Sequence, residues 1–276
     1  IIVLAEQRAL NSASIDKDLK IVEIPIESLE KSAAHNNWIK NLNKDQTDYW
    51  LFTRRRFLFL MDLMSCTEYD ANVIQLETDN LLFYDVSNAR CSLADCYSGI
   101  AATFNNDFRC IPGLVYVSNA EAFEKLADEF AANSHIKIDD MRLIGKFSVR
   151  YGKEFIDYLP VVPPEFVEAI DICDDLVGKV GCRARFAHNA ENLGFVFDGS
   201  SLGQFLGGTD YGEEEGFVTK ESVVDPIRLS VTWELDQSGR KVPIVRYQND
   251  AIRLANLHVQ SKRLDRFCSL SQVSEH

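Results

Sequence analysis

The sequence predicts an α/β protein in which helices pack on a sheet that contains neighbouring parallel strands. Short apolar runs typical of strands alternate with segments whose apolar residues recur at helical spacing. Hydrophobic residues make up 46% of the 276 residues, which is ample for a core. The chain has no internal repeat and no linker rich in Pro, Gly or Ser, so we expect a single domain over residues 1–276.

The first third of the chain gives the strand, helix, strand order on which this fold class depends. Residues 1–6 and 20–26 have the pattern of short strands, separated by a polar stretch without clear periodicity. From about residue 48 to residue 64, Trp50 and Phe57 begin an apolar series at helical spacing. An apolar strand follows this helix, so the order favours an α/β arrangement with parallel neighbours.

The remaining elements are predicted by capping, glycine and proline signals. The pair Ser118 and Glu121 has the spacing of a capping box, which predicts that a helix begins there. The other predicted elements are strands over residues 99–104 and 114–117, a helix around Met141, a helical stretch over residues 166–177, and a short helix from Asp198 to the pair Gly207 and Gly208.

Two acidic residues, Glu77 and Asp79, stand between two apolar runs that have the pattern of strand interior. Carboxylates two residues apart project to the same side of an extended chain, and at the end of a strand they can face one divalent cation. The chemistry indicated is a phosphate group held by a metal. The segment Glu-Thr-Asp-Asn is also ordinary turn composition between two strands, and both interpretations stay open at this point.

The net charge and the cysteine content indicate which class of partner and which cellular compartment we expect. The net charge of −13 argues against a nucleic-acid partner, whose phosphates such a surface would repel. The seven cysteines have no zinc-ligand spacing, which favours reduced thiols and a cytoplasmic location. No apolar run reaches 18 residues, so we expect no transmembrane segment.

The basic stretch over residues 240–268 holds seven basic residues against two acidic ones. This fits a small phosphorylated ligand, although solvated surface is the default for any charge run. The stretch contains His258 and Lys262, four residues apart. A histidine beside carboxylates suits Mn²⁺ better than Mg²⁺, which is the harder and more oxygen-preferring ion. A lysine in the same place can neutralise a diphosphate. A single histidine is more often packed in a core than bound to a metal, so His258 gains weight only together with Glu77 and Asp79.

Asp198 precedes the predicted short helix, and two interpretations of it stay open. A carboxylate at this position can cap free backbone N–H groups, which is the simpler interpretation. It can also point into a cleft as a general base or as an acceptor for a hydroxyl group.

Four motifs together resemble a group of GT-A type glycosyltransferases found in polysaccharide-synthesis proteins. They are ETDNLLFY (77–84), IPGLVYV (111–117), FDGSSLGQFLGG (197–208) and NLHVQSKRL (256–264). The resemblance spans about residues 48–267, and the order of the four motifs makes it stronger than any one of them. It implies a GT-A-like (Rossmann-like) mixed sheet flanked by helices, a nucleotide-sugar donor, and a glycan or other hydroxyl acceptor.

The resemblance also implies roles for single residues. Asp79 would bind the metal directly, His258 would complete the metal shell, and Lys262 would contact the diphosphate. Glu77 would hold donor hydroxyls and reach the metal through water, because it is one methylene longer than the aspartate that is frequent in the family. Further donor contacts would come from Gly113 and from Arg56, for which a surface helix role is an equal alternative.

If the reaction inverts the anomeric centre, one carboxylate must deprotonate the acceptor hydroxyl from the far side of the sugar. We expect Asp198 to be that base, with Asp140 as the second choice. A retaining reaction would need neither carboxylate. The strand at residues 1–6 corresponds to the second strand of the family, so we expect a first strand and its base-binding loop to be absent from this sequence.

Two other function classes stay open. A nucleotidyltransferase would also use acidic residues and a metal, but it would carry a glycine-rich phosphate loop near its first strand, and the sequence shows none. A non-catalytic module that binds nucleotide-sugars would show no transfer even with metal present.

Overall fold

The computed structural model describes residues 1–12, 20–42, 49–65, 68–172, 175, 182–209, 218–259 and 267. The chain forms two compact units, one from residues 1–71 and 119–140 and the other from residues 72–118 and 141–276. Each unit therefore combines stretches that are separate in the sequence. The single domain expected over residues 1–276 stays a prediction.

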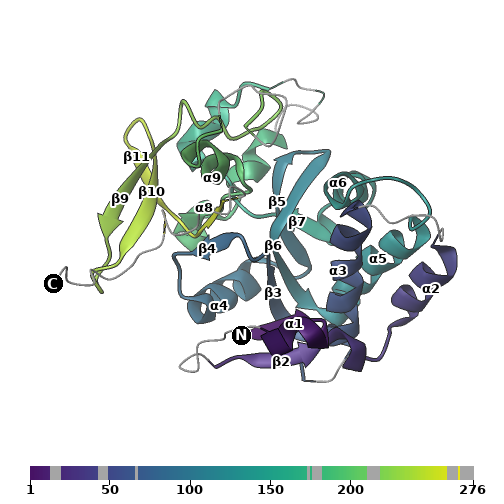
Figure 1. Ribbon diagram of the computed structural model, residues 1–276. Helices are drawn as coiled ribbons and strands as arrows, with labels where there is room; N and C mark the ends of the chain where they lie inside the picture. Colours follow the sequence, from purple (N-terminus) through teal and green to yellow (C-terminus); the bar gives the residue numbers. More distant parts are fainter. Residues whose placement is uncertain are drawn as a thin grey trace. The chain divides into compact units, whose positions relative to one another are not determined.

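The first unit contains a small parallel sheet and three longer helices (Figure 1). Its elements are β1 (Ile2–Ala5), α1 (Gln7–Ser12), β2 (Val22–Pro25), η1 (Ile26–Ser28), α2 (Ala33–Asn41), α3 (Tyr49–Met64) and α5 (Ala120–Ala132). Strands β1 and β2 confirm both predicted strands, and they pair in parallel. The polar stretch between them includes the short helix α1, which its weak periodicity did not predict. The parallel neighbours expected around the helix at residues 48–64 do not pair, because β2 and β3 (Ala71–Leu76) belong to different sheets.

Helices α2, α3 and α5 share the core of the first unit. The Phe57 ring of α3 stacks on the Phe130 ring of α5 with centroids 4.9 Å apart, so Phe57 is buried as predicted. Trp50, the first residue of the predicted apolar series, is 42% exposed and does not belong to the buried face. Helix α5 begins one residue later than predicted. Its cap is Asn119, whose side chain accepts a hydrogen bond from the Ala122 N–H, whereas the Ser118 hydroxyl donates to the Ser98 carbonyl.

The second unit holds most of the strands. Its elements are β3 (Ala71–Leu76), β4 (Asn80–Leu82), α4 (Val86–Cys96), β5 (Ile100–Asn106), β6 (Arg109–Asn119), α6 (Asp140–Tyr151), η2 (Gly152–Glu154), β7 (Ile156–Tyr158), η3 (Pro164–Ala169), η4 (Cys182–Ala187), α8 (Ala190–Leu193), β8 (Phe195–Val196), α9 (Ser201–Leu206), β9 (Ser230–Leu235), β10 (Lys241–Tyr247), β11 (Asp250–Leu254) and β12 (Asn256–His258).

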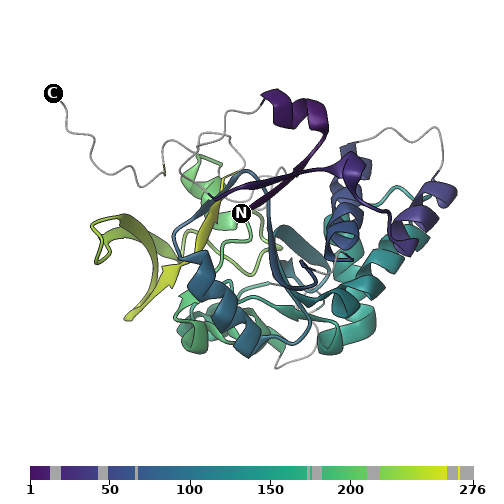
Figure 2. The same cartoon turned by 90° about the horizontal axis from the view of Figure 1, so that it is seen from below.

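The central sheet of this unit has the strand order β3-β6-β5-β7. Strands β5 and β6 are antiparallel and β5 and β7 are parallel, so the sheet is mixed. All seven residues of β5 are buried, as expected for a strand covered on both faces. A second sheet has the order β8-β11-β10-β9, and Figure 2 shows its β9 and β10 strands as a curved ribbon.

These observations confirm the α/β class with mixed sheets and helices. The described strands form four separate sheets rather than the one sheet expected, and the GT-A assignment stays a prediction. Of the helical stretch predicted over residues 166–177, residues 166–169 belong to the 3₁₀ helix η3 and residues 170–172 are not helical. Residues 173, 174 and 176–181 lie outside the described residues. The short helix after Asp198 is observed as α9 and ends at Gly207.

Candidate metal centre

The smallest sheet of the second unit brings the two distant motifs together. Strands β4 and β12 pair in antiparallel order, with His258 opposite Asn80. Glu77 and Asp79 lie in the turn between β3 and β4, directly before that pair. The Nε2 atom of His258 lies 3.1 Å from Glu77 Oε2 and 3.2 Å from Asp79 Oδ1. The three side chains therefore form one cluster, with their potential ligand atoms within 4.8 Å of one another.

Backbone hydrogen bonds fix the turn that carries the two carboxylates. The Glu77 N–H donates to the Gly113 carbonyl of β6 at 2.9 Å, and the Asn80 N–H donates to the Glu77 carbonyl at 3.2 Å. The Val259 N–H donates to the Asp79 carbonyl at 2.9 Å. The turn is thus tied both to the central sheet and to the strand that carries the imidazole. The turn composition of this segment and its metal-ligand pattern are compatible, because the turn presents both carboxylates.

The imidazole of His258 is buried, with 3% of its side chain exposed. Within the described part of the chain, neither ring nitrogen forms a hydrogen bond, although Nε2 faces the two carboxylates. A buried polar atom without a hydrogen bond requires an explanation. For Nε2, a cation shared with the two carboxylates is one, and a direct ion pair with them is another. The side chains of Glu77 and Asp79 are 25% and 31% exposed, so the cluster is open on the carboxylate side.

The observed separations match those of neighbouring ligands on one ion. Two ligands at right angles, each about 2.2 Å from a metal, lie about 3.1 Å apart. This is the spacing of Nε2 from both carboxylate oxygens. One imidazole nitrogen with two carboxylates suits Mn²⁺ or a similar transition metal, and it suits Mg²⁺ less well because Mg²⁺ favours oxygen ligands.

Gly113 provides the space that the imidazole occupies. A Cβ at this position would lie 2.5 Å from both Cε1 and Nδ1 of His258 and 3.0 Å from Nδ2 of Asn80. The Gly113 carbonyl also accepts a hydrogen bond from Asn80 Nδ2 at 3.0 Å. The geometry therefore gives Gly113 a role in shaping the cluster of Glu77, Asp79 and His258. Its role in donor binding stays a prediction.

Two buried asparagines connect the segments around the cluster. Asn256 Nδ2 donates to Asn80 Oδ1 at 2.7 Å and to the Asp198 carbonyl at 3.0 Å, and its Oδ1 accepts from the Asp198 N–H at 3.0 Å. Both asparagines lie inside the motifs ETDNLLFY and NLHVQSKRL, but no local pattern indicates their role. Their signal is their position, since one directly follows Asp79 and the other lies two residues before His258.

Asp198 is buried and caps the first turn of α9. Its two carboxylate oxygens accept hydrogen bonds from the N–H groups of Ser200, Leu202, Gly203 and His258. Burial raises the pKa of Asp198, and the backbone hydrogen bonds oppose that rise. Only 2% of the residue is exposed, so the structure supports the capping interpretation. The general-base interpretation does not fit a carboxylate whose oxygens are both bonded to backbone.

Arg56 and Asp140, both in the first unit, form an ion pair with each other. Arg56 Nη2 lies 2.8 Å from Asp140 Oδ2, and the Asp140 side chain is 4% exposed. Burial raises the pKa of Asp140, and the Arg56 charge opposes that rise. A shared structural role explains both residues, so the geometry does not support Asp140 as a base or Arg56 as a donor contact.

Lys262, the predicted diphosphate contact, lies outside the described residues. Two other members of the basic stretch are paired with acidic residues of the hairpin region. Arg240 bonds Asp236 at 3.0 Å, and Arg246 bonds Glu234. These two cations are therefore balanced locally rather than gathered into a patch for a phosphorylated ligand.

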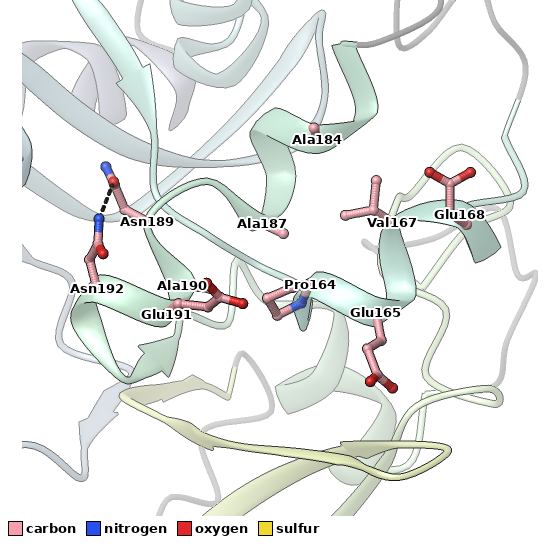
Figure 3. A pocket seen from close by; sticks show the side chains of 10 residues that line it. All are labelled: Pro164, Glu165, Val167, Glu168, Ala184, Ala187, Asn189, Ala190, Glu191 and Asn192. Atoms are coloured by element: carbon pink, nitrogen blue, oxygen red, sulfur yellow. Dashed lines mark hydrogen bonds between the residues drawn. The ribbon is translucent and has the colours of Figure 1, made fainter.

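A surface pocket of about 420 Å³ in the second unit is separate from this cluster (Figure 3). It is lined by residues of η3, η4 and α8 and contains none of the three potential ligands. Figure 3 shows Glu165 and Glu168 pointing in opposite directions, so these two acidic side chains do not converge on one point.

Comparisons with known proteins found no match. No protein-family model, no curated protein and no solved structure matches the chain. Among the described residues, no helix combines the length and the apolar character needed to cross a membrane.

Proposed function

We propose that this protein is a metal-dependent glycosyltransferase that moves a sugar from a nucleoside-diphosphate donor to a glycan or other hydroxyl acceptor. The observation that supports this most directly is that the carboxylates of Glu77 and Asp79 converge on the buried imidazole of His258. These residues come from two of the four motifs that resemble the GT-A enzymes. The cluster has the ligand types that such a donor site requires.

The chemistry follows from where charge develops. As the bond between sugar and diphosphate breaks, negative charge grows on the departing nucleoside diphosphate. A divalent cation held by Glu77, Asp79 and His258 would stabilise that charge as a Lewis acid. The two carboxylates are partly exposed, which leaves their side of the cluster accessible to a donor. Lys262 is proposed as the second positive group at the diphosphate.

We propose Mn²⁺ as the preferred ion, with Mg²⁺ as the weaker alternative, because one ligand is an imidazole nitrogen. Catalysis in this proposal acts on the leaving group. The carboxylates of Asp198 and Asp140 are both engaged in structural interactions, so we assign the deprotonation of the acceptor to neither.

The test measures nucleotide binding and turnover. The full chain is titrated by calorimetry with UDP, GDP, CDP and their sugars, with and without Mn²⁺, and release of nucleoside diphosphate is followed with a hydroxyl acceptor. We expect one nucleotide series to bind only with Mn²⁺, and D79A to lose that binding. The matched control is E191A, which removes an exposed carboxylate of the same unit remote in sequence from the cluster.

The outcomes separate the three function classes. Sugar transfer by the wild type but not by D79A supports the proposal. Metal-dependent turnover of a nucleoside triphosphate and a sugar phosphate would replace it with a nucleotidyltransferase. Binding of a nucleotide-sugar without any turnover would favour the non-catalytic module, and full binding by D79A would contradict the metal site itself.

A further inference from the structure

We infer that Asp198 is a positioning residue for the metal centre, because its carboxylate fixes the backbone of His258 and so holds the imidazole in place. The inference rests on the metal site of the proposed function and adds to it a residue that contacts neither the ion nor a donor. It also gives a role to a buried carboxylate that the proposed reaction does not use.

One carboxylate joins two segments that are far apart in the sequence. Oδ1 accepts from the Ser200 N–H at 2.8 Å and from the Leu202 N–H at 3.1 Å. Oδ2 accepts from the Gly203 N–H at 2.8 Å and from the His258 N–H at 3.0 Å. Asp198 therefore clamps the start of α9 to the last residue of β12.

The strand that carries His258 needs such an acceptor. In the described part of the chain β12 pairs only with β4, so one side of its backbone has no strand partner. A buried N–H group without an acceptor is costly. The Asp198 carboxylate supplies that acceptor at His258 itself, on a residue whose side chain must remain in a fixed position.

The surrounding residues are shaped to this clamp. A Cβ on Gly203 would collide with the His258 carbonyl oxygen and would lie 2.8 Å from Asp198 Oδ2, so only glycine allows this approach. Ser200 is held at φ 122°, a conformation that favours glycine, while its N–H bonds Asp198. Local backbone strain is thus retained where the clamp requires it.

The backbone of Asp198 is also hydrogen-bonded to β12, through the side chain of Asn256. Asn256 Oδ1 accepts a hydrogen bond from the Asp198 N–H at 3.0 Å, and Asn256 Nδ2 donates one to the Asp198 carbonyl at 3.0 Å. The main chain and side chain of Asp198 thus contact β12 at positions 256 and 258. Contacts outside the ligand shell orient metal ligands and strengthen metal binding. Here the contact fixes His258 through its main chain rather than through its ring.

The experiment compares D198N with a matched control. The amide keeps the shape of the side chain but replaces one acceptor oxygen by an NH₂ group, so it cannot serve all four N–H groups. D107N is the control, because Asp107 is another buried aspartate of the same unit, bonded to Arg185 and Tyr158. Mn²⁺ affinity is measured by calorimetry below the unfolding temperature of each variant.

We expect D198N to lower Mn²⁺ affinity by about 10–100-fold, and D107N to lower the unfolding temperature without changing that affinity. Pulsed electron paramagnetic resonance of bound Mn²⁺ gives a readout that general destabilisation does not move. The nitrogen coupling from His258 should be present in the wild type and in D107N, and weakened or lost in D198N. Wild-type affinity and nitrogen coupling in D198N would overturn the inference.

Two further measurements apply if D198N does not fold. G203A disturbs the same clamp from the side of α9 and should also weaken Mn²⁺ binding. In the wild type, hydrogen exchange of the N–H groups of Ser200, Gly203 and His258 should slow when Mn²⁺ binds, and unchanged exchange would overturn the inference. A wild type that binds no metal would instead refute the metal site and the proposed function together.

Discussion

Replacing Gly113 with alanine should weaken metal binding as well as the fold. The new Cβ would lie 2.5 Å from Cε1 and Nδ1 of His258, whereas non-bonded carbon atoms prefer about 3.5–4.0 Å. The ring must therefore withdraw by about 1 Å. Because Nε2 lies 3.1 Å and 3.2 Å from the two carboxylate oxygens, a shift of that size moves it out of the cluster.

The expected magnitude follows from that displacement. Disturbing a metal-binding histidine through its surroundings costs about 10–100-fold in affinity, which corresponds to about 1.4–2.8 kcal/mol. Overpacking of a buried position costs about 1–3 kcal/mol in the free energy of unfolding. Calorimetric titration with Mn²⁺ measures the first quantity, and denaturant unfolding without metal measures the second.

A matched glycine separates the two effects. A Cβ on Gly99 would lie 3.0 Å from the Phe155 carbonyl oxygen, so G99A adds a tight contact in the same unit that involves none of the cluster residues. It should lower stability and leave Mn²⁺ affinity unchanged. If G113A binds Mn²⁺ as tightly as G99A and the wild type, the reasoning about the imidazole is wrong.

Three further predictions concern the buried polar groups. N256L should destabilise the fold by about 1–3 kcal/mol in denaturant unfolding, because it leaves buried polar partners unpaired; wild-type stability would contradict the network. R56M should also cost about 1–3 kcal/mol by leaving buried Asp140 without its cation, and an unchanged free energy of unfolding would deny the pair a structural role. Burial raises the pKa of Asp140 above 3.8, so the stability contributed by its protonated form is present below pH 3.8 and is lost as the pH rises through the raised pKa. As the pH rises from 3.8 through the raised pKa, the free energy of unfolding of the wild type should therefore fall relative to that of D140N. A difference between the two that does not change with pH would refute this.

Local signals in the sequence predicted the elements that local physics determines. The apolar series of α3 and the Asp-Gly entry to α9 both produce helices in the structure. The prediction that Ser118 caps α5 is wrong. Ser118 and Asn119 are both suitable capping residues, and only the hydrogen bond of Ser118 with Ser98 decides between them. Such a contact depends on tertiary structure and leaves no local pattern.

The three side chains of the candidate site could be picked out from the sequence, but the contacts that bring them together could not. Glu77 and Asp79 stand out because they follow an apolar strand, and the resemblance pointed to His258. Their convergence depends on the pairing of β4 with β12. These two strands are far apart in the sequence, and no periodicity within either strand predicts that they pair. The same limit explains the interpretation of Asp198, since an aspartate before a helix has the same local signature whether its oxygens bond backbone or face a cleft.

The central claim is that Glu77, Asp79 and His258 hold one divalent cation. It is tested most directly by anomalous diffraction near the manganese absorption edge from crystals of the full chain soaked in Mn²⁺. We predict one strong peak within bonding distance of His258 Nε2 and of a carboxylate oxygen from Asp79 and from Glu77, the last contact being direct or through one water. A peak at another site, or none among these three side chains at a saturating Mn²⁺ concentration, would contradict the account.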